Sequence, residues 1–230
     1  MFDAIAERYD FLNHLLSAGI DRRWRRCAVR SLRLGGGERV LDVCTGTADL
    51  AIAALRAAPA ARRVIGVDFA DAMLRVGQQK IRRDPSSSRL SLVRGDAARL
   101  PVADASVDAI TIGFGIRNVE DIAAAAAEFF RVLKPGGRLA ILEFSVPTMP
   151  VVSRLYLWYL RHVVPRVGTA LSRHDEAYGY LPASIDAFAT PTAFMKCLRH
   201  AGFSDVSAVR LTFGSVSLYT AVRAEGAGQR

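Results

Sequence analysis

One short run constrains the fold of this chain more than any other: Val40-Leu-Asp-Val-Cys-Thr-Gly-Thr-Ala-Asp49. Its β-branched apolar residues predict a buried strand, and the carboxylate and glycine that follow predict a tight turn. A turn of this kind presents backbone N–H groups to a ligand at the end of the strand. We therefore interpret Asp42, Thr45 and Gly46 as parts of a cofactor-binding loop.

Two later segments extend this interpretation. The apolar run 64–67 ends in Asp68, about 22 residues past Gly46, where nucleotide-binding units place the carboxylate that binds ribose. Gly95-Asp96-Ala97 follows a third apolar run, and a carboxylate there can accept a hydrogen bond from an adenine amine. Taken singly, Asp42 and Asp68 are also ordinary residues of strand-end turns. Their joint spacing favours an adenosine pocket.

The loop lacks the features that bind a pyrophosphate. A dinucleotide needs the closely spaced glycines of G-x-G-x-x-G and a helix start that does not repel phosphate. Here Ala48 stands in place of the second glycine, and Asp49 would repel a phosphate. S-adenosylmethionine carries an ammonium and a sulfonium, which Asp42 and Asp49 would attract. The sequence therefore predicts S-adenosylmethionine as the cofactor, while Asp49 also suits a helix N-cap.

Apolar runs alternate with helical stretches after this loop, the pattern of a doubly wound, Rossmann-like α/β sheet. We predict strands at 40–43, 64–67, 90–93, 108–112 and 138–144, and helices at 50–58, 71–82 and 121–133. Pro135 and the glycines after it end the third helix and turn the chain into the fifth strand. Thr190-Pro191 starts a last helix, and the runs 206–211 and 216–222 predict a terminal strand pair. We expect a mostly parallel sheet with an antiparallel terminal strand.

The length of 230 residues suits a single domain, 1–230, which we divide into four parts. Residues 1–36 form an N-terminal helical cap, with Trp24, Ala28 and Leu32 on one face of a helix over 21–32. Residues 37–145 form the cofactor-binding core, and 146–189 form a lid inserted over the carboxyl ends of the strands. Residues 190–230 form the terminal helix and strand pair.

The first half of the lid, 151–164, is apolar and aromatic, with Arg154 and Arg161 at intervals. Two interpretations stay open: a helix packed on the core, or a hydrophobic lid over a lipid tail that also touches the membrane. The formal net charge of +9 supports attraction to anionic lipid, although an arginine-rich composition explains it equally well.

Composition and spacing argue against several other classes of protein. The cationic residues are spread along the chain and form no stripe with aromatic residues, so we expect no nucleic-acid binding. No run approaches the roughly 20 apolar residues of a membrane span, and the first residues lack a secretion signal, so we expect a cytoplasmic protein. Three cysteines and four histidines without ligand spacing predict no metal site.

Three motifs along the chain carry a resemblance to a known family. They are Phe2-Asp-x-Ile-Ala-x-x-Tyr9-Asp10-x-x-Asn13-x-x-Leu-Ser17-x-Gly19-x-Asp21-x-x-Trp24-Arg25, Gly113-Phe-Gly-Ile-Arg117-Asn118 and Arg131-Val-Leu-Lys-Pro-Gly-Gly-Arg-Leu-x-x-Leu-Glu143-Phe-Ser145-x-Pro147. With Thr212-Phe213-Gly214 near the end, they resemble the ubiquinone/menaquinone biosynthesis C-methyltransferase family. The cofactor loop alone would place the chain only among class I S-adenosylmethionine-dependent methyltransferases.

The resemblance implies methyl transfer from S-adenosylmethionine to a ring carbon of a polyprenylated quinol. The substrate would be demethylmenaquinol, converted to menaquinol, or the benzoquinol precursor of ubiquinone, and Ala48 is more similar to the menaquinone-type members. The cofactor contacts that the resemblance carries over are Thr47, Asp68, Asp96, Ala97 and Gly113. Peripheral contact with anionic lipid at the inner face of the membrane, and a homodimer, stay open as further associations.

The implied chemistry needs groups that stabilise an oxyanion, because a quinol carbon becomes nucleophilic when a neighbouring hydroxyl loses its proton. Arg117 suits a quinolate oxygen or an ordered water, since its guanidinium is always charged and presents a planar fork of donors. Asn118 can orient the second oxygen, and Tyr9 can donate or relay a proton. The structural alternative for Arg117 is an ion pair with Asp121 at the start of the next helix.

Three other functions stay open from the sequence. A methyltransferase acting on another lipid or small molecule would keep every cofactor residue. A non-catalytic scaffold would bind S-adenosylmethionine and leave all acceptors unmethylated. A dinucleotide dehydrogenase is disfavoured by Ala48 and Asp49.

Overall fold

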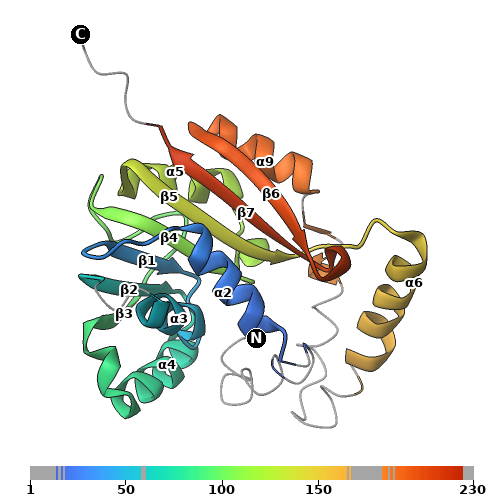
Figure 1. The fold of residues 1–230 in the computed structure, drawn as a ribbon, viewed down its shortest axis with the longest axis horizontal. Helices are drawn as coiled ribbons and strands as arrows, with labels where there is room; N and C mark the ends of the chain where they lie inside the picture. Colours follow the sequence, from blue (N-terminus) through green and yellow to red (C-terminus); the bar gives the residue numbers. More distant parts are fainter. Residues whose placement is uncertain are drawn as a thin grey trace.

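One seven-stranded sheet forms the centre of the molecule (Figure 1). The computed structural model describes residues 14, 17, 19–57, 61–164, 166, 183–185, 187–188 and 190–224. The strands in chain order are β1 (Arg39–Val43), β2 (Arg63–Asp68), β3 (Leu90–Arg94), β4 (Val107–Gly113), β5 (Leu133–Phe144), β6 (Phe203–Leu211) and β7 (Val216–Arg223). They lie across the sheet in the order β3-β2-β1-β4-β5-β7-β6.

The sheet is doubly wound, because the direction of strand addition reverses between β1 and β4. Strands β3, β2, β1, β4 and β5 run parallel, whereas β7 runs antiparallel to both β5 and β6. The predicted fold class, a mostly parallel α/β sheet with an antiparallel terminal strand, is therefore confirmed. In such sheets ligands bind beyond the carboxyl ends of the strands, at the point of reversal.

Helices cover both faces of the sheet (Figure 1). One face carries α2 (Asp21–Ser31), α3 (Asp49–Ala57) and α4 (Asp71–Arg83), and the other carries α5 (Ile122–Val132) and α9 (Pro191–His200). Neighbouring residues of β1 alternate between them, since Val40 packs with the first group and Leu41 with the second. The bounds of α2 to α5 lie within one residue of the predicted ones.

The clearest departure from the predicted elements lies at the start of β5. The sequence predicts a turn at 134–137 and a strand from 138, but β5 begins at Leu133. Val107 pairs with Leu133 and Ala109 pairs with Arg138, so the residues between them bulge out of the ladder. Gly136 has a left-handed φ of 75° in this bulge. The turn chemistry is therefore real, but the predicted start of the strand is wrong.

The segment after β5 is helical, as in the first of the two interpretations of 151–164. α6 (Pro150–Trp158) continues into a π-helix, η3 (Tyr159–Val163). Leu160 and Val164 pack with Ile185 in a small apolar cluster. The opposite face of the segment stays exposed, so core packing accounts for only part of it. The predicted cap and lid both include residues outside the described ranges, and their boundaries stay predictions.

Candidate functional site

The carboxyl ends of the central strands surround a cavity of about 890 Å³. Segments that follow β1, β2, β3 and β4 all contribute to its wall, as expected at the point where the strand order reverses. Six of the predicted site residues line this wall: Gly46, Asp68, Asp96, Ala97, Gly113 and Asn118. The fold therefore brings together residues that lie far apart in the sequence.

The loop after β1 has an unusual backbone. Cys44, Gly46 and Ala48 have positive φ values of 53°, 54° and 70°. This left-handed conformation costs a non-glycine residue roughly 1–2 kcal/mol, so the surrounding structure must impose it on Cys44 and Ala48. The Thr45 N–H donates to the Val67 carbonyl at 3.0 Å, which ties the loop to the end of β2. The strained loop is thus fixed in place, as a ligand-binding backbone requires.

Asp68 joins two backbone segments at the cavity wall. Its Oδ2 accepts a hydrogen bond from the Gly46 N–H at 2.7 Å, and its Oδ1 accepts one from the Ala70 N–H at 2.8 Å. Phe69, the next residue, is 70% exposed and also lines the cavity. An exposed ring beside a carboxylate suits a planar base. Phe69 is not among the predicted site residues, although its place directly after Asp68 is a usable signal.

The end of β4 leaves room for backbone atoms but hardly for a side chain. A Cβ atom on Gly113 would lie 3.0 Å from Leu50 Cδ2, and one on Gly115 would lie 2.3 Å from Cys44 Cβ. The absence of a Cβ at Gly115 therefore lets the chain after β4 approach the loop after β1. Gly113 itself offers only backbone to the cavity.

Asp42 lies beneath the loop, outside the described cavity wall. Its carboxylate is fully buried and accepts hydrogen bonds from Thr45 Oγ1 and Thr111 Oγ1, both at 2.6 Å. Burial raises the pKa of Asp42 to about 6, against the opposing effect of these two donors. In this arrangement Asp42 and Thr45 hold the loop against β4 from below.

The raised pKa of Asp42 should appear in the pH dependence of stability. An acid with a folded-state pKa of about 6 and an ordinary value of 3.8 binds more protons when folded, so the free energy of unfolding falls as pH rises between these values. The loss should reach roughly 3 kcal/mol above pH 6. Urea unfolding at about pH 4, 5 and 7 should show this loss in the wild type and not in Asp42→Asn. Parallel pH profiles for the two proteins would contradict it.

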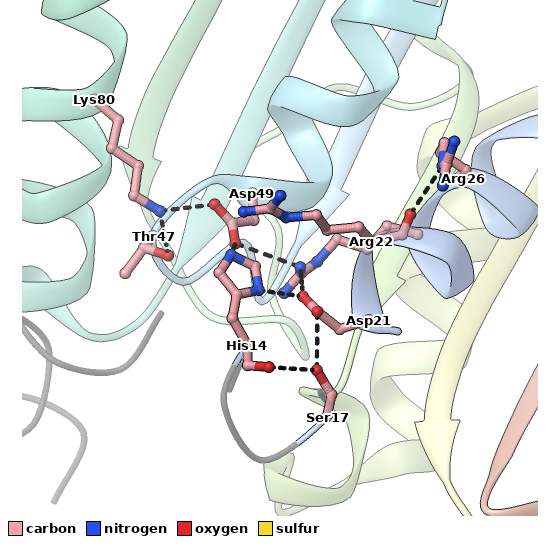
Figure 2. Close-up of polar contacts among 9 residues, drawn as sticks. His14, Ser17, Asp21, Arg22, Arg26, Thr47, Asp49 and Lys80 are labelled. Carbon is pink, nitrogen blue, oxygen red and sulfur yellow. Dashed lines mark hydrogen bonds and ion pairs between the residues drawn. The ribbon is translucent and has the colours of Figure 1, made fainter. Parts of the chain in front are cut away.

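Thr47 also lies outside the described cavity wall, in a polar network between three helices (Figure 2). Lys80 Nζ donates to Thr47 Oγ1 at 3.0 Å and to Asp49 Oδ1 at 2.7 Å. Burial would raise the pKa of Asp49, but the charges of Arg25 and Lys80 hold it below its usual value. Thr47 and Asp49 therefore fix the start of α3 to α4.

Arg117 forms a buried ion pair with Glu143, a partner that the sequence does not predict. Its Nη1 lies 2.7 Å from Glu143 Oε1, and the two side chains are 5% and 0% exposed. The proposed alternative, an ion pair with Asp121, is wrong. Asp121 instead caps α5 by accepting a hydrogen bond from the Ala124 N–H at 2.9 Å. Glu143 appears in the third motif, but its partner lies 26 residues away in the chain.

Arg117 and Asn118 share the short helix η2 (Ile116–Asn118) and face different neighbours. Asn118 lines the cavity, whereas Arg117 Nε donates to Ser184 Oγ in the lid segment at 3.2 Å. Arg117 thus lies between Asn118 on the wall of the cofactor cavity and Ser184 in the segment predicted as a lid. Tyr9 lies outside the described residues.

Aromatic contacts connect the N-terminal helix to this region. Trp24 Nε1 on α2 donates to Thr212 Oγ1 at 2.8 Å, in the turn between β6 and β7. The Trp24 ring lies 5.9 Å from Phe114, and Phe114 lies 4.6 Å from Phe144, measured between ring centres. One described residue from each of the three motifs, Trp24, Phe114 and Phe144, therefore meets the others beside the Thr212 turn.

The similarity to known proteins covers nearly the whole chain. The model of the ubiE/COQ5 methyltransferase family matches residues 1–223. A ubiquinone/menaquinone biosynthesis C-methyltransferase UbiE from Syntrophotalea carbinolica is 48% identical over 223 residues, which cover 97% of this chain and 92% of that protein. A demethylmenaquinone methyltransferase from Bacteroides fragilis is 42% identical, with 97% of this chain and 91% of that protein covered.

Solved structures agree in fold at much lower identity. A SAM-dependent methyltransferase from Aquifex aeolicus has a TM-score of 0.60 at 17% identity and covers 86% of this chain and 89% of its own. Identity at this level shows the fold alone. The family match extends over nearly the whole chain and includes the cofactor loop and all three motifs, and the chain therefore belongs to the ubiE/COQ5 methyltransferase family.

Proposed function

We propose that this protein transfers a methyl group from S-adenosylmethionine to a ring carbon of a polyprenylated quinol. The principal substrate is demethylmenaquinol, and the benzoquinol precursor of ubiquinone is a second one. The observation that carries the proposal is the cavity in which Gly46, Asp68, Asp96 and Asn118 meet. Relatives named for this chemistry at 42% and 48% identity support it.

The groups on the cavity wall fit S-adenosylmethionine. Asp68 and Asp96 offer carboxylates to ribose hydroxyls and to an adenine amine, and Phe69 and Met73 offer apolar surface to the base. When bound, S-adenosylmethionine supplies a methyl group activated on a sulfonium. Glu120 on the same wall adds negative charge, which favours a cationic ligand over a pyrophosphate.

The part of the protein in the reaction is to hold the quinol while its hydroxyl loses a proton and the ring carbon takes the methyl group. That carbon then loses its hydrogen as a proton, and the oxygen regains one, which restores the quinol. Arg117 would stabilise the resulting quinolate oxygen, because its ion pair with Glu143 keeps the guanidinium in a fixed direction. Asn118 would orient the second oxygen from the cavity wall. Tyr9 would relay the proton. Most of the acceleration then comes from positioning and from exclusion of water.

Replacing Asp68 by Ala should weaken S-adenosylmethionine binding by about 1.5–3 kcal/mol. The ribose would lose a charged acceptor, and the Gly46 N–H would lose the carboxylate that holds its loop. Calorimetry measures this directly, with Asp71→Ala on α4 as the control and with NAD as a ligand that should not bind comparably. Unchanged affinity in Asp68→Ala would remove Asp68 from the site.

The proposal extends to the membrane, where a polyprenylated quinol resides. On α6 and η3, Val151, Leu155 and Trp158 are 79%, 66% and 54% exposed and lie at helical spacing on one face. Arg154 and Arg161 are exposed along the same segment. No helix in the described part of the chain is long and apolar enough to span a bilayer. We propose that this exposed face rests on anionic lipid at the inner side of the membrane.

Liposome co-sedimentation tests this contact. Binding should strengthen with phosphatidylglycerol and weaken with salt, since each arginine near an anionic surface contributes about 1 kcal/mol and is screened by ions. Leu155→Asn with Trp158→Ala should lower binding by an order of magnitude or more, because partial burial of these side chains in lipid contributes roughly 2 kcal/mol. Val93→Thr, exposed on β3, is the control. Binding indifferent to lipid charge and to the Leu155→Asn, Trp158→Ala pair would contradict the contact.

The substrate is tested by the quinone content of cells that lack the protein. Demethylmenaquinone should accumulate, and wild-type protein should restore menaquinone while Arg117→Lys should not. A normal quinone profile in these cells would favour a methyltransferase that acts on a different acceptor. It would leave the cofactor site, which is measured separately by calorimetry, unaffected.

A further inference from the structure

A second cavity, of about 1120 Å³, lies between α2, α3 and α4. It shares no lining residue with the cofactor cavity among the described residues. Four arginines of α2, one arginine of α3, and a lysine and an arginine of α4 line it. In the described part of the chain, Asp49 and Asp84 are the carboxylates on its wall. The cavity therefore holds a large excess of positive charge contributed by three separate helices.

At the end of this cavity that holds Asp49, which we call the inner end of the cleft, side chains of the protein neutralise the positive charge. Lys80 Nζ lies 2.7 Å from Asp49 Oδ1, and Arg25 Nη1 lies 3.4 Å from Asp49 Oδ2. Arg25 also contacts Asp21. His14 Nδ1 lies 2.7 Å from Asp21 Oδ2 (Figure 2). These contacts account for the two cations nearest the loop after β1. The positive charge at the inner end is therefore balanced without a bound anion.

At the opposite end, which we call the outer end of the cleft, most of the positive charge is not balanced by carboxylates of the described residues. Arg22, Arg26, Arg30 and Arg83 are exposed, and no carboxylate among the described residues pairs with them. Arg56 shares this end and pairs with Asp84 at 2.9 Å. Like charges held around one hollow repel each other, and a bound anion would relieve this repulsion.

The shape of the cleft narrows the class of anion. Ligand pockets are commonly 300–1,000 Å³, so a cavity of about 1120 Å³ has room for much more than one small ion. Ile52, Ala53 and Ala57 of α3 add apolar surface to its wall. Arginine is the residue best matched to phosphate oxygens, because its planar fork donates two parallel hydrogen bonds. The wall therefore suits a phosphate-bearing ligand that also has an apolar part.

We infer that the cleft between α2, α3 and α4 binds a phosphate-bearing anion through Arg26, Arg30 and Arg83 at its outer end. The ligand comes either from an anionic phospholipid headgroup or from a soluble organic phosphate, which present the same oxygens to these arginines. This site is distinct from the cofactor cavity and does not depend on the proposed methyl transfer.

Calorimetry at low ionic strength with two probes distinguishes the sources. Inorganic pyrophosphate represents a soluble phosphate, and dihexanoyl phosphatidylglycerol below its micelle concentration represents a headgroup. Dihexanoyl phosphatidylcholine, which has no net charge, is the ligand control. Saturable binding of pyrophosphate supports a soluble phosphate, and saturable binding of the phosphatidylglycerol alone supports a headgroup.

Matched variants separate the cleft from general surface charge. Arg26→Gln with Arg83→Gln should lower the affinity for the probe that binds, on the order of tenfold or more. Arg23→Gln with Arg82→Gln removes the same charge from the same two helices, at exposed positions that do not line the cleft, and should bind nearly as wild type. Equal weakening in both pairs, weakening in neither, or no saturable binding of either probe would overturn the inference.

Discussion

Arg117→Lys is expected to slow single-turnover methyl transfer by on the order of 10²–10³-fold. An ammonium keeps the charge beside Glu143, but it cannot reproduce the planar fork that reaches Glu143 and Ser184 and that, in the proposed function, would also reach the oxyanion. Affinity for S-adenosylmethionine should stay unchanged, because the described wall of the cofactor cavity does not include Arg117. The loss therefore falls on the chemical step alone.

This rate is measured by rapid mixing of demethylmenaquinol with enzyme saturated with S-adenosylmethionine. The reaction is then quenched, and the product is analysed by mass spectrometry. Arg138→Lys is the matched control, since Arg138 donates to the Leu32 carbonyl at 2.6 Å far from the cavity. Wild-type transfer by Arg117→Lys would return Arg117 to a structural role. A parallel loss of cofactor affinity would instead place it in the cofactor site.

Glu143→Ala is expected to lower the free energy of unfolding by about 3–5 kcal/mol. Glu143 is fully buried, and its removal leaves the Arg117 guanidinium charged in a poorly solvated place. It also removes the acceptor of the Phe144 N–H, at 2.8 Å. Urea unfolding at neutral pH measures the loss, which should be smaller in Glu143→Gln because the amide keeps an acceptor oxygen.

A double variant shows what the buried pair is for. Arg117→Met with Glu143→Leu removes both charges, so it should recover much of the stability that Glu143→Ala loses, although the Phe144 N–H stays unsatisfied. Methyl transfer should be absent in this double variant, because it lacks the Arg117 guanidinium. If the double variant is as unstable as Glu143→Ala, burial of an unpaired charge is not the cause of the loss.

The fold is well predicted from sequence because its central strands are buried on both faces. The runs 40–43 and 64–67 are largely apolar stretches bounded by turns, interrupted only by Asp42 and Gly66, a pattern typical of parallel strands covered by helices. The start of β5 escapes prediction because 134–137 has ordinary turn chemistry, and only the pairing of Leu133 with Val107 shows that the strand has already begun.

The cofactor site is predictable as far as spacing along the chain determines it. Gly46, Asp68 and Asp96 follow successive parallel strands, so their meeting follows from topology. Spacing cannot say whether Asp42 points up into the cavity or down onto Thr111, because that depends on how β4 lies beside β1. The pairing of Arg117 with Glu143 depends in the same way on the register of β5.

The most direct measurement is the incubation of purified protein with S-adenosylmethionine labelled on its methyl group and with reduced demethylmenaquinol. The account predicts that the label appears on a ring carbon of menaquinol, one label per turnover, and that Arg117→Lys transfers almost none. Binding of S-adenosylmethionine without any labelled quinone would contradict the account, and it would leave a cofactor-binding protein with another acceptor or with none.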